Sequence, residues 1–373
     1  MTSSGASFNA AEKLDWLQLV RTETIGPITF FRLIARFGSA GAALRALPEI
    51  ARRAGRSSAL SVFPRRDAEA ELARADALGC RLIAAGEPAY PVMLGMMPDR
   101  PPLIYVRGHA SLFERPAVAV IGARNASASG RRMARNLSEG LGRAGVVVVS
   151  GLARGIDSAA HEAALDSGTI AVVAGGADVV YPPENAGLMS EIANRGVVLS
   201  ERPPGLEPTA RDFPRRNRLI SGLSRGVVVV EAAAKSGTLI TARFALDQGR
   251  EVFAVPGSPL DPRCQGANGL IRQGATLVET AEDILSVLAE QNRGAREGRT
   301  LDNFGEAGEP DQALIVEVRA AVREQLSYTP MHRDAILREL NHPASLVIDA
   351  LLELVLSGEA EEHSGGRFAL RVD

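Results

Sequence analysis

The chain has few cysteines, few histidines and no long apolar run. Its 373 residues include only Cys80 and Cys264, which lie far apart and outside any metal-ligand spacing, so we expect reduced, structural thiols. The five scattered histidines argue against a zinc site, and we expect no metal. The sequence contains neither 18 consecutive apolar residues nor a signal peptide, which predicts a soluble cytoplasmic protein with no membrane contact.

Positive charge is also scarce overall, because the formal net charge is −2. This balance does not indicate that the whole surface binds nucleic acid, so charge has to be examined segment by segment. Lys13 and Lys235 are the only lysines. The arginine bias is consistent with genomic base composition, but Lys235 is notable because it stands at a glycine turn.

Three segments share one pattern, in which an apolar strand is followed by a small-residue turn with one cation and then by a helix. They are residues 117–137 with the turn Gly122-Ala123-Arg124, residues 146–165 with Ser150, Gly151 and Arg154, and residues 226–246 with Lys235-Ser236-Gly237-Thr238. A turn that leads into a helix N-terminus offers backbone N–H groups to an anion. Three such turns predict a phosphate-rich ligand at one edge of a sheet.

The strand and helix pattern predicts an α/β protein with a mainly parallel, doubly wound sheet. Valine and isoleucine runs alternate with helical segments, which is typical of a sheet covered on both faces. Residues 80–108 add two short strands. The predicted strands of the alternating region are 117–121, 146–150, 169–173, 197–200, 226–231, 251–255 and 275–278. Ligands of such sheets bind outside the carboxyl ends of the strands.

The remaining segments predict smaller modules at both ends of the chain. We expect a helical domain over 1–75, in which residues 24–27 form either a helix-hairpin-helix turn or part of a plain helical packing module. The α/β domain then covers 76–290, and a polar, Gly-rich linker covers 291–312. Residues 313–373 resemble a winged helix, with three helices and a Ser-Gly-Gly hairpin. Acidic residues outnumber arginines there, so we expect a protein contact or a structural role rather than DNA reading.

The strongest local charge is the arginine cluster in "RDFPRRNRLISGLSR", residues 211–225. Arginines around Phe213 suit a single strand, since cations hold the backbone while a base stacks on the ring. A solvated helix start with Phe213 in the core remains the alternative. Asp157 and His161, four residues apart, could form an acid/base pair, but a helix N-cap and a satisfied, partly buried histidine are favoured. The P-loop spacing is absent, which argues against nucleotide hydrolysis.

Taken together, these motifs resemble the DNA-processing protein A family (DprA, also called Smf) over nearly the whole chain. The resemblance rests on "YPVMLGMMPDRPPLIYVRG", "VIGARNASASG", "VVSGLARGIDSAAH", "AGGADVVYPPEN", "LSERPPG", "FPRRNRLISGLSRGVVVVEAAAKSGTLITARFALDQGREVFAVPGS" and "GANGLIRQGA". It implies a small SAM-like or helix-hairpin-helix domain, an extended Rossmann-like core and a winged-helix tail. It also implies a role in natural transformation, in which the protein binds and protects incoming single-stranded DNA and loads the RecA recombinase.

The resemblance further implies a homodimer with no cofactor and no catalytic residue. Carried over by position, the implied phosphate pocket consists of Gly122, Arg124, Ser150, Gly151, Arg154, Arg215, Arg216, Asn217, Arg218, Lys235, Ser236, Gly237 and Thr238. Phe213 is the candidate stacking residue. We expect Arg124→Glu or Arg216→Glu to weaken DNA binding strongly and to leave the fold intact.

Two other functions stay open at this point. The first is a Rossmann-type enzyme of the phosphoribohydrolase kind, in which Thr238 and Glu231 would correspond to the glycine-threonine turn and its nearby acid. The segment "AAAKSGT" matches that group's "PGGxGT" signature poorly. The second is a protein-only scaffold whose terminal modules dock partners.

Overall fold

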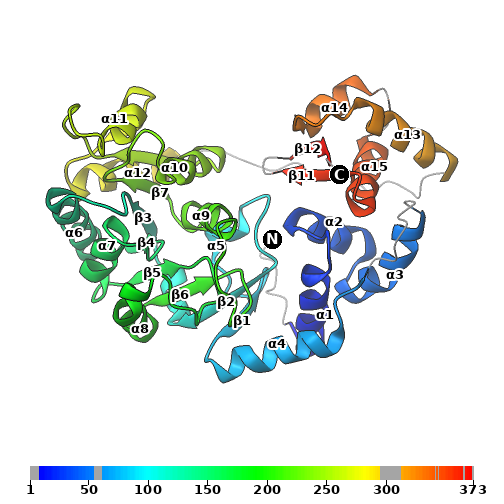
Figure 1. Cartoon of the computed structure of the whole chain (residues 1–373), viewed down its shortest axis with the longest axis horizontal. Coiled ribbons are helices and arrows are strands. Elements are labelled where there is room, and N and C mark those ends of the chain that lie inside the picture. The colour runs from blue at the N-terminus through cyan, green and yellow to red at the C-terminus, as the bar shows by residue number, and fades with distance from the viewer. Residues whose placement is uncertain are drawn as a thin grey trace. The chain divides into compact units, whose positions relative to one another are not determined.

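A computed structural model of the chain describes residues 8–53, 61–294, 312–340, 342, 344–363 and 366–371 (Figure 1). The chain forms two compact units. The first contains Ala70–Met97 and Leu103–Arg299, and the second contains Phe8–Glu69, Pro98–Pro102 and Thr300–Asp373. Each unit has its own sheet or helical core and is described separately below.

A sheet of nine strands forms the centre of the first unit. Its strands are β1 (Arg81–Ala84), β2 (Leu103–Gly108), β3 (Ala117–Ile121), β4 (Val147–Ser150), β5 (Thr169–Val172), β6 (Val197–Ser200), β7 (Gly226–Val229), β8 (Glu251–Ala254) and β9 (Thr276–Leu277). Their order is β1-β2-β6-β5-β4-β3-β7-β8-β9. The seven strands from β3 onward pair in parallel, whereas β1 and β2 are antiparallel additions at one edge.

The strand order reverses between β3 and β7, which are neighbours in the sheet although the strands β4, β5 and β6 lie between them in sequence. From β3 the chain winds outward through β4, β5 and β6, and from β7 it winds in the other direction through β8 and β9. Pairing across the reversal sets Val120 opposite Val228. Such a switch point leaves a crevice at the carboxyl ends of the strands, where α/β proteins bind ligands.

Helices cover both faces of this sheet, as the sequence predicts. They are α5 (Val92–Gly95), α6 (Ala128–Arg143), α7 (Ile156–Ala164), α8 (Ala186–Arg195), α9 (Asp212–Gly222), α10 (Thr238–Asp247), α11 (Gln265–Arg272) and α12 (Ala281–Gly294), with 3₁₀ turns at Ala110–Glu114 and Pro183–Asn185. The apolar residues of α6, α7 and α12 form one core with Val118, Val148 and Val228 of the sheet. Helices α9 and α10 pack together, and α10 contacts β7 and β8 outside that core.

The second unit contains the helical N-terminal segment, with α1 (Ala10–Arg21), α2 (Pro27–Phe37), α3 (Ala40–Arg53) and the start of α4 (Arg65–Ala77). Asn9 and Glu12 cap α1 reciprocally, since each side chain accepts the other's backbone N–H. The predicted hairpin turn lies between α1 and α2, where Pro27 occupies the first turn of α2.

The same unit contains the winged helix. It consists of α13 (Gln312–Gln325), β10 (Met331–His332), α14 (Arg333–Glu339), α15 (Ala344–Ser357), β11 (Ala360–His363) and β12 (Arg367–Leu370), with sheet order β10-β12-β11. Phe368 of β12 is fully buried against the apolar inner faces of α13 and α15. Three helices and a terminal hairpin confirm the predicted architecture.

The mainly parallel, doubly wound α/β fold with two terminal modules is confirmed, but the predicted linker needs a correction. Residues 291–294 belong to α12 and Gln312 begins α13, so both ends of the 291–312 segment are helical. Residues 295–311 lie outside the described residues. The domain boundaries 1–75, 76–290 and 313–373 stay predictions. Within the described ranges, no helix is long and apolar enough to span a bilayer.

Candidate functional site

Two adjoining cavities lie at the carboxyl ends of the parallel strands. One has a volume of about 240 Å³ and the other of about 930 Å³. The turns after β3, β4, β5 and β7 and the helix α9 supply their walls. Arg124, Phe213 and Arg216 line both cavities, so the two spaces form one continuous site at the topological switch point.

Most of the site residues predicted from the sequence line these cavities. They are Gly122, Arg124, Gly151, Arg154, Phe213, Arg216, Asn217, Lys235, Ser236, Gly237 and Thr238. Three predicted residues, Ser150, Arg215 and Arg218, do not line either cavity. Two of them, Ser150 and Arg218, are engaged inside the protein, whereas Arg215 is exposed.

Ser150 and Arg218 are used inside the protein. Ser150 is fully buried and its hydroxyl donates to the carbonyl of Val120, which fixes β4 to β3. Arg218 is buried and donates to both carboxylate oxygens of Glu201, at 2.7 and 2.6 Å. Arg215 is exposed on α9. The hydroxyl of Ser150 and the guanidinium of Arg218 are thus already bound within the protein, and their predicted place in a phosphate pocket gains no support from the structure.

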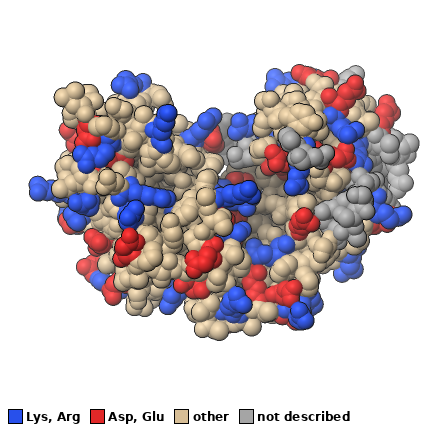
Figure 2. All heavy atoms as spheres, viewed as in Figure 1, with Lys and Arg blue, Asp and Glu red and all other residues tan. Residues whose placement is uncertain are grey.

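The site is locally positive although the whole chain is not. Figure 2 shows basic and acidic side chains interspersed over one face of the molecule. The lining of the two cavities, by contrast, has five basic side chains and two acidic ones: Arg124, Arg154, Arg216, Lys235 and Arg263 against Asp157 and Glu184. Such an excess at a concave surface attracts a polyanion.

The basic side chains differ in how far they are already neutralised. Arg154 faces Glu184 at 3.6 Å, and both side chains are exposed. Arg263 donates to the carboxylate of Asp261. Arg124 and Lys235 are exposed and have no acidic partner within 4.0 Å among the described residues. These two cations are therefore the ones most available to a phosphate.

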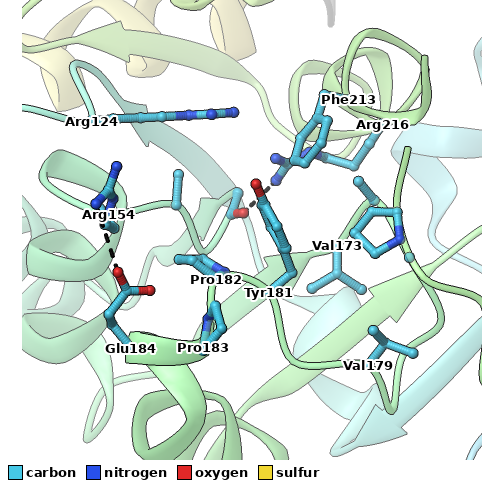
Figure 3. Close-up of a pocket in the computed structure, with 15 residues that line it drawn as sticks. Arg124, Arg154, Val173, Val179, Tyr181, Pro182, Pro183, Glu184, Phe213 and Arg216 are labelled. Carbon is cyan, nitrogen blue, oxygen red and sulfur yellow. Dashed lines mark hydrogen bonds and ion pairs between the residues drawn. The ribbon is translucent and has the colours of Figure 1, made fainter. Parts of the chain in front are cut away.

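Two aromatic rings stand beside the Arg124 cation. In Figure 3, Arg124 extends across the mouth of the smaller cavity toward Phe213, and Tyr181 rises from the wall below. The Arg124 guanidinium carbon lies 5.2 Å from the centroid of the Phe213 ring. The Phe213 and Tyr181 rings are 5.4 Å apart and tilted by 57°. A cation and two partly exposed rings in one wall can bind a phosphate and a planar base together.

Arg216 forms the floor of the site and acts mainly on the protein. Arg216 is only 7% exposed, and its Nη1 donates to the carbonyls of Gly151 at 2.5 Å and Val172 at 2.7 Å. Burial lowers the pKa of Arg216 to about 10, and the nearby Asp157 opposes that shift. Arg216 thus joins the ends of β4 and β5. The expectation that Arg216→Glu leaves the fold intact does not suit this buried position.

Asp157 holds the β4–α7 turn from the inside. Its carboxylate accepts the N–H groups of Gly151 at 3.1 Å and Ala153 at 3.3 Å. Burial raises the pKa of Asp157, and the Arg216 charge and these N–H donors oppose the rise. The prediction that Asp157 is the N-cap of its helix is wrong: Gly155 is the N-cap of α7, and Asp157 is the second helical residue.

His161 is a buried structural residue. Its Nδ1 lies 2.7 Å from the hydroxyl of Thr169, and burial lowers its pKa to about 3. The ring is therefore neutral near pH 7. An acid/base pair with Asp157 gains no support, because His161 is fully buried and lines neither cavity.

The two glycine turns after β3 and β4 fit against each other. Gly155 has φ of 84°, and a Cβ there would collide with the carbonyl oxygen of Ala123. The amide of Ile156 donates to the same carbonyl at 3.3 Å. The close approach fixes the backbone that carries Arg124 relative to the backbone that carries Arg154.

A carboxylate of the protein already occupies the N-terminus of α6. Glu231, which follows β7, is 5% exposed and accepts the backbone N–H of Ser127 at 2.9 Å and its hydroxyl at 2.5 Å. A Cβ on Gly130 would lie 2.5 Å from the Glu231 carboxyl carbon. An anion at a helix N-terminus is favourable, so Glu231 takes the place where a dinucleotide phosphate binds in other sheets of this kind.

The turn after β7 is also tied to the turn after β3. The hydroxyl of Thr238 donates to the carbonyl of Gly122 at 3.2 Å and accepts from the hydroxyl of Ser236 at 3.0 Å. Lys235 stays exposed at the tip of this turn. The turn therefore presents one cation next to Arg124, while its hydroxyl groups hold the two turns together.

Sequence reasoning did not select two lining residues that bear on function, Tyr181 and Arg263. Tyr181 follows β5 and Arg263 follows β8, so both come after the carboxyl end of a strand. The strand-end rule that selected the glycine turns could have found them. Among the described residues, no cluster of His, Cys, Asp and Glu could hold a metal ion.

Three family models match the chain in order. The model "DNA recombination-mediator protein A" matches residues 81–289, which contain the whole site. A "DprA-like N-terminal HHH domain" matches residues 10–74, and a "DprA winged helix domain" matches residues 307–366.

Relatives and solved structures agree with these matches. The Smf protein of Escherichia coli (strain K12) is 39% identical over 313 residues, which cover 83% of this chain and 82% of that protein. The DNA processing protein DprA of Streptococcus pneumoniae is 47% identical over 199 residues, 53% of this chain and 70% of that protein.

Two solved structures share the fold with identities above 30%. The X-ray structure of DprA from Streptococcus pneumoniae superposes with a TM-score of 0.64 at 36% identity, over 75% of this chain and 98% of that one. The DNA processing protein A of Helicobacter pylori, described for its single-stranded DNA binding mode, superposes with a TM-score of 0.51 at 31% identity. It covers 54% of this chain and 94% of that one.

Proposed function

Because the chain belongs to the DNA recombination-mediator protein A family, we propose that it binds single-stranded DNA in the strand-end site and protects it during natural transformation. The DNA backbone follows Arg124 and Lys235 at the two turns that flank the topological switch point. A base stacks on Phe213 beside Tyr181. The solved relative from Helicobacter pylori, known for its single-stranded DNA binding mode, supports this proposal.

One observation carries the proposal: an exposed cation lies over an exposed aromatic wall at the carboxyl ends of the sheet. Arg124 is 5.2 Å from the Phe213 ring and has no acidic partner among the described residues. A duplex hides its base faces in the stack, whereas a single strand can place a base on the ring while its phosphates meet the cation. The site therefore favours single strands with little sequence preference.

The family name supports a further step, in which the bound strand is passed to the RecA recombinase. We propose that this transfer takes place in the cytoplasm and that the chain works as a homodimer. The strand β9 forms one edge of the sheet, and Leu277 on it is 47% exposed. A strand at the edge of a sheet has unpaired backbone groups, which can pair with a second copy.

We propose that the protein is not an enzyme, since the residues that a phosphoribohydrolase would need for catalysis, Glu231 and Thr238, form hydrogen bonds within the fold. Glu231 caps α6 through Ser127, and the Thr238 hydroxyl bonds the Gly122 carbonyl. Neither group is left to act on a nucleotide. Release of free base from a nucleoside monophosphate, measured by chromatography over a long incubation, would favour the phosphoribohydrolase alternative.

The salt dependence of DNA binding gives the first test. Full-length protein is titrated into a labelled oligo-dT strand and into its dT·dA duplex at about 50 and 200 mM salt, and fluorescence anisotropy is recorded. We expect tight binding of the single strand, weaker binding of the duplex and a steep loss of affinity at the higher salt. Equal affinity for both forms, or no binding at low salt, would contradict the proposal.

A further inference from the structure

The third helix of the winged helix has a composition that does not suit DNA. Helix α15 (Ala344–Ser357) contains Asp349 and Glu353 and no Lys, Arg or His. A recognition helix in the major groove runs between two phosphate backbones, and its cations supply much of the affinity. A helix with only negative charges is repelled there.

Helix α15 is instead apolar on two faces. One face, which includes Leu351 and Leu354, packs in the core of the winged helix around Phe368. The other face carries Leu352 and Leu356, which are 3% and 1% exposed and belong to a different cluster. A helix that is apolar on two faces is buried on more than one side.

The N-terminal helical segment covers this second face. Leu352 and Leu356 share one buried cluster with residues of the N-terminal helical segment, namely Leu19, Ile25, Phe30, Leu33, Ala40, Ala43 and Leu47. Helix α15 contacts α3 directly, and Figure 1 shows it beside the N-terminal helices within the second unit. The two modules thus share a core although more than 250 residues separate them in sequence.

Opposite charges frame this contact. Arg32 of α2 lies 3.1 Å from the Glu362 carboxylate of β11, and its guanidinium carbon is 5.3 Å from the Phe368 ring centroid. Arg36 of α2 faces Asp349 of α15 at 3.7 Å. The helical segment contributes the cations and the winged helix contributes the acids, so the two surfaces are complementary in charge as well as in apolar area.

We propose that this winged helix is a protein-binding module whose partner is the chain's own N-terminal helical segment, and that α15 does not read duplex DNA. The acidic residues of the winged helix then complement the arginines of α2. The inference goes beyond the single-strand function, because it concerns a different unit of the molecule.

The test replaces the two leucines that face the helical segment and leaves the winged-helix core unchanged. Hydrogen–deuterium exchange is measured by mass spectrometry on the full-length chain and on Leu352→Asn/Leu356→Asn, which keeps the charge constant. We expect exchange in α2 and α3 to rise roughly tenfold or more, while β10–β12 keep their protection. Glu324→Gln, on an exposed position of α13 that takes no part in this contact, is the control and should change exchange little.

Unchanged exchange in α2 and α3 of the folded double variant would overturn the docking. Should the double substitution also unfold the winged helix, Arg32→Glu replaces it, because that change sets two carboxylates against each other from the helical side. Duplex affinity is measured on the same proteins by anisotropy. A gain in duplex binding upon release of α15 would show a hidden DNA reader and overturn the second part, whereas we expect none. Neither readout depends on single-strand binding.

Discussion

Replacing Arg216 with methionine is expected to lower the free energy of unfolding of the α/β unit by ~3–5 kcal/mol. The substitution keeps most of the side-chain volume but removes the donor that joins the carbonyls of Gly151 and Val172. It also leaves the buried Asp157 without its cation. An uncompensated buried charge is costly, so the ends of β4 and β5 lose their connection.

The matched control is Arg215→Met, which makes the same change on the neighbouring, exposed position of α9. Surface substitutions of this kind usually alter stability by about 0.5 kcal/mol or less. Urea unfolding followed by circular dichroism compares the two variants with the wild type. Equal stability of both variants would show that Arg216 does not hold the strand ends together.

Arg124→Glu is expected to weaken binding of oligo-dT by roughly 10–150-fold and to leave the stability of the unit unchanged. Arg124 is exposed, and its contact within the protein is with the partly exposed Phe213 ring, so its loss removes no buried contact. A hydrogen bond to a charged group contributes about 1.5–3 kcal/mol, which corresponds to this change in affinity. Loss of one phosphate contact should also reduce the slope of log K against log salt by about 0.7.

Arg132→Glu provides the control for net charge, because it makes the same change on an exposed position of α6 that lines neither cavity. Anisotropy titrations of both variants separate a local contact from a general electrostatic effect. A similar loss of affinity in both would place the binding of DNA outside the strand-end site.

The strands of the α/β unit could be predicted because their sequence pattern is simple. A strand buried on both faces is a continuous apolar run, and Val147–Ser150 and Gly226–Val229 belong to such runs. The ends of the helices were harder to predict. Residues 291–294 are polar and Gly-containing, which favoured a linker, but they continue the amphipathic α12.

The arginine cluster of α9 shows the limit of charge counting. Phe213, Arg216, Asn217 and Ile220 follow the i, i+3, i+4, i+7 spacing of one helix face, and these four residues line the larger cavity. Arg215 and Arg218 lie off that face. Helical periodicity applied to this segment would have separated the two groups, whereas the density of arginines alone combined them.

The role of Glu231 could not be predicted from the sequence. The residue follows β7, yet its carboxylate caps α6, which begins more than 100 positions earlier. Only the pairing of β3 with β7 brings the two together. The same pairing brings Lys235 near Arg124: the turn pattern predicts that both lie at one edge of the sheet, but the order of the strands decides that they are neighbours.

Photocrosslinking tests most directly that a single strand lies on the wall formed by Phe213 and Tyr181. Oligo-dT that carries 5-iodo-deoxyuridine is bound to the full-length protein and irradiated, and mass spectrometry identifies the crosslinked residues. The account predicts crosslinks at Tyr181 or Phe213, whose rings lie 5.4 Å apart in the site, and their loss in Arg124→Glu. Crosslinks confined to the helical segment or the winged helix, with none in the α/β unit, would contradict it.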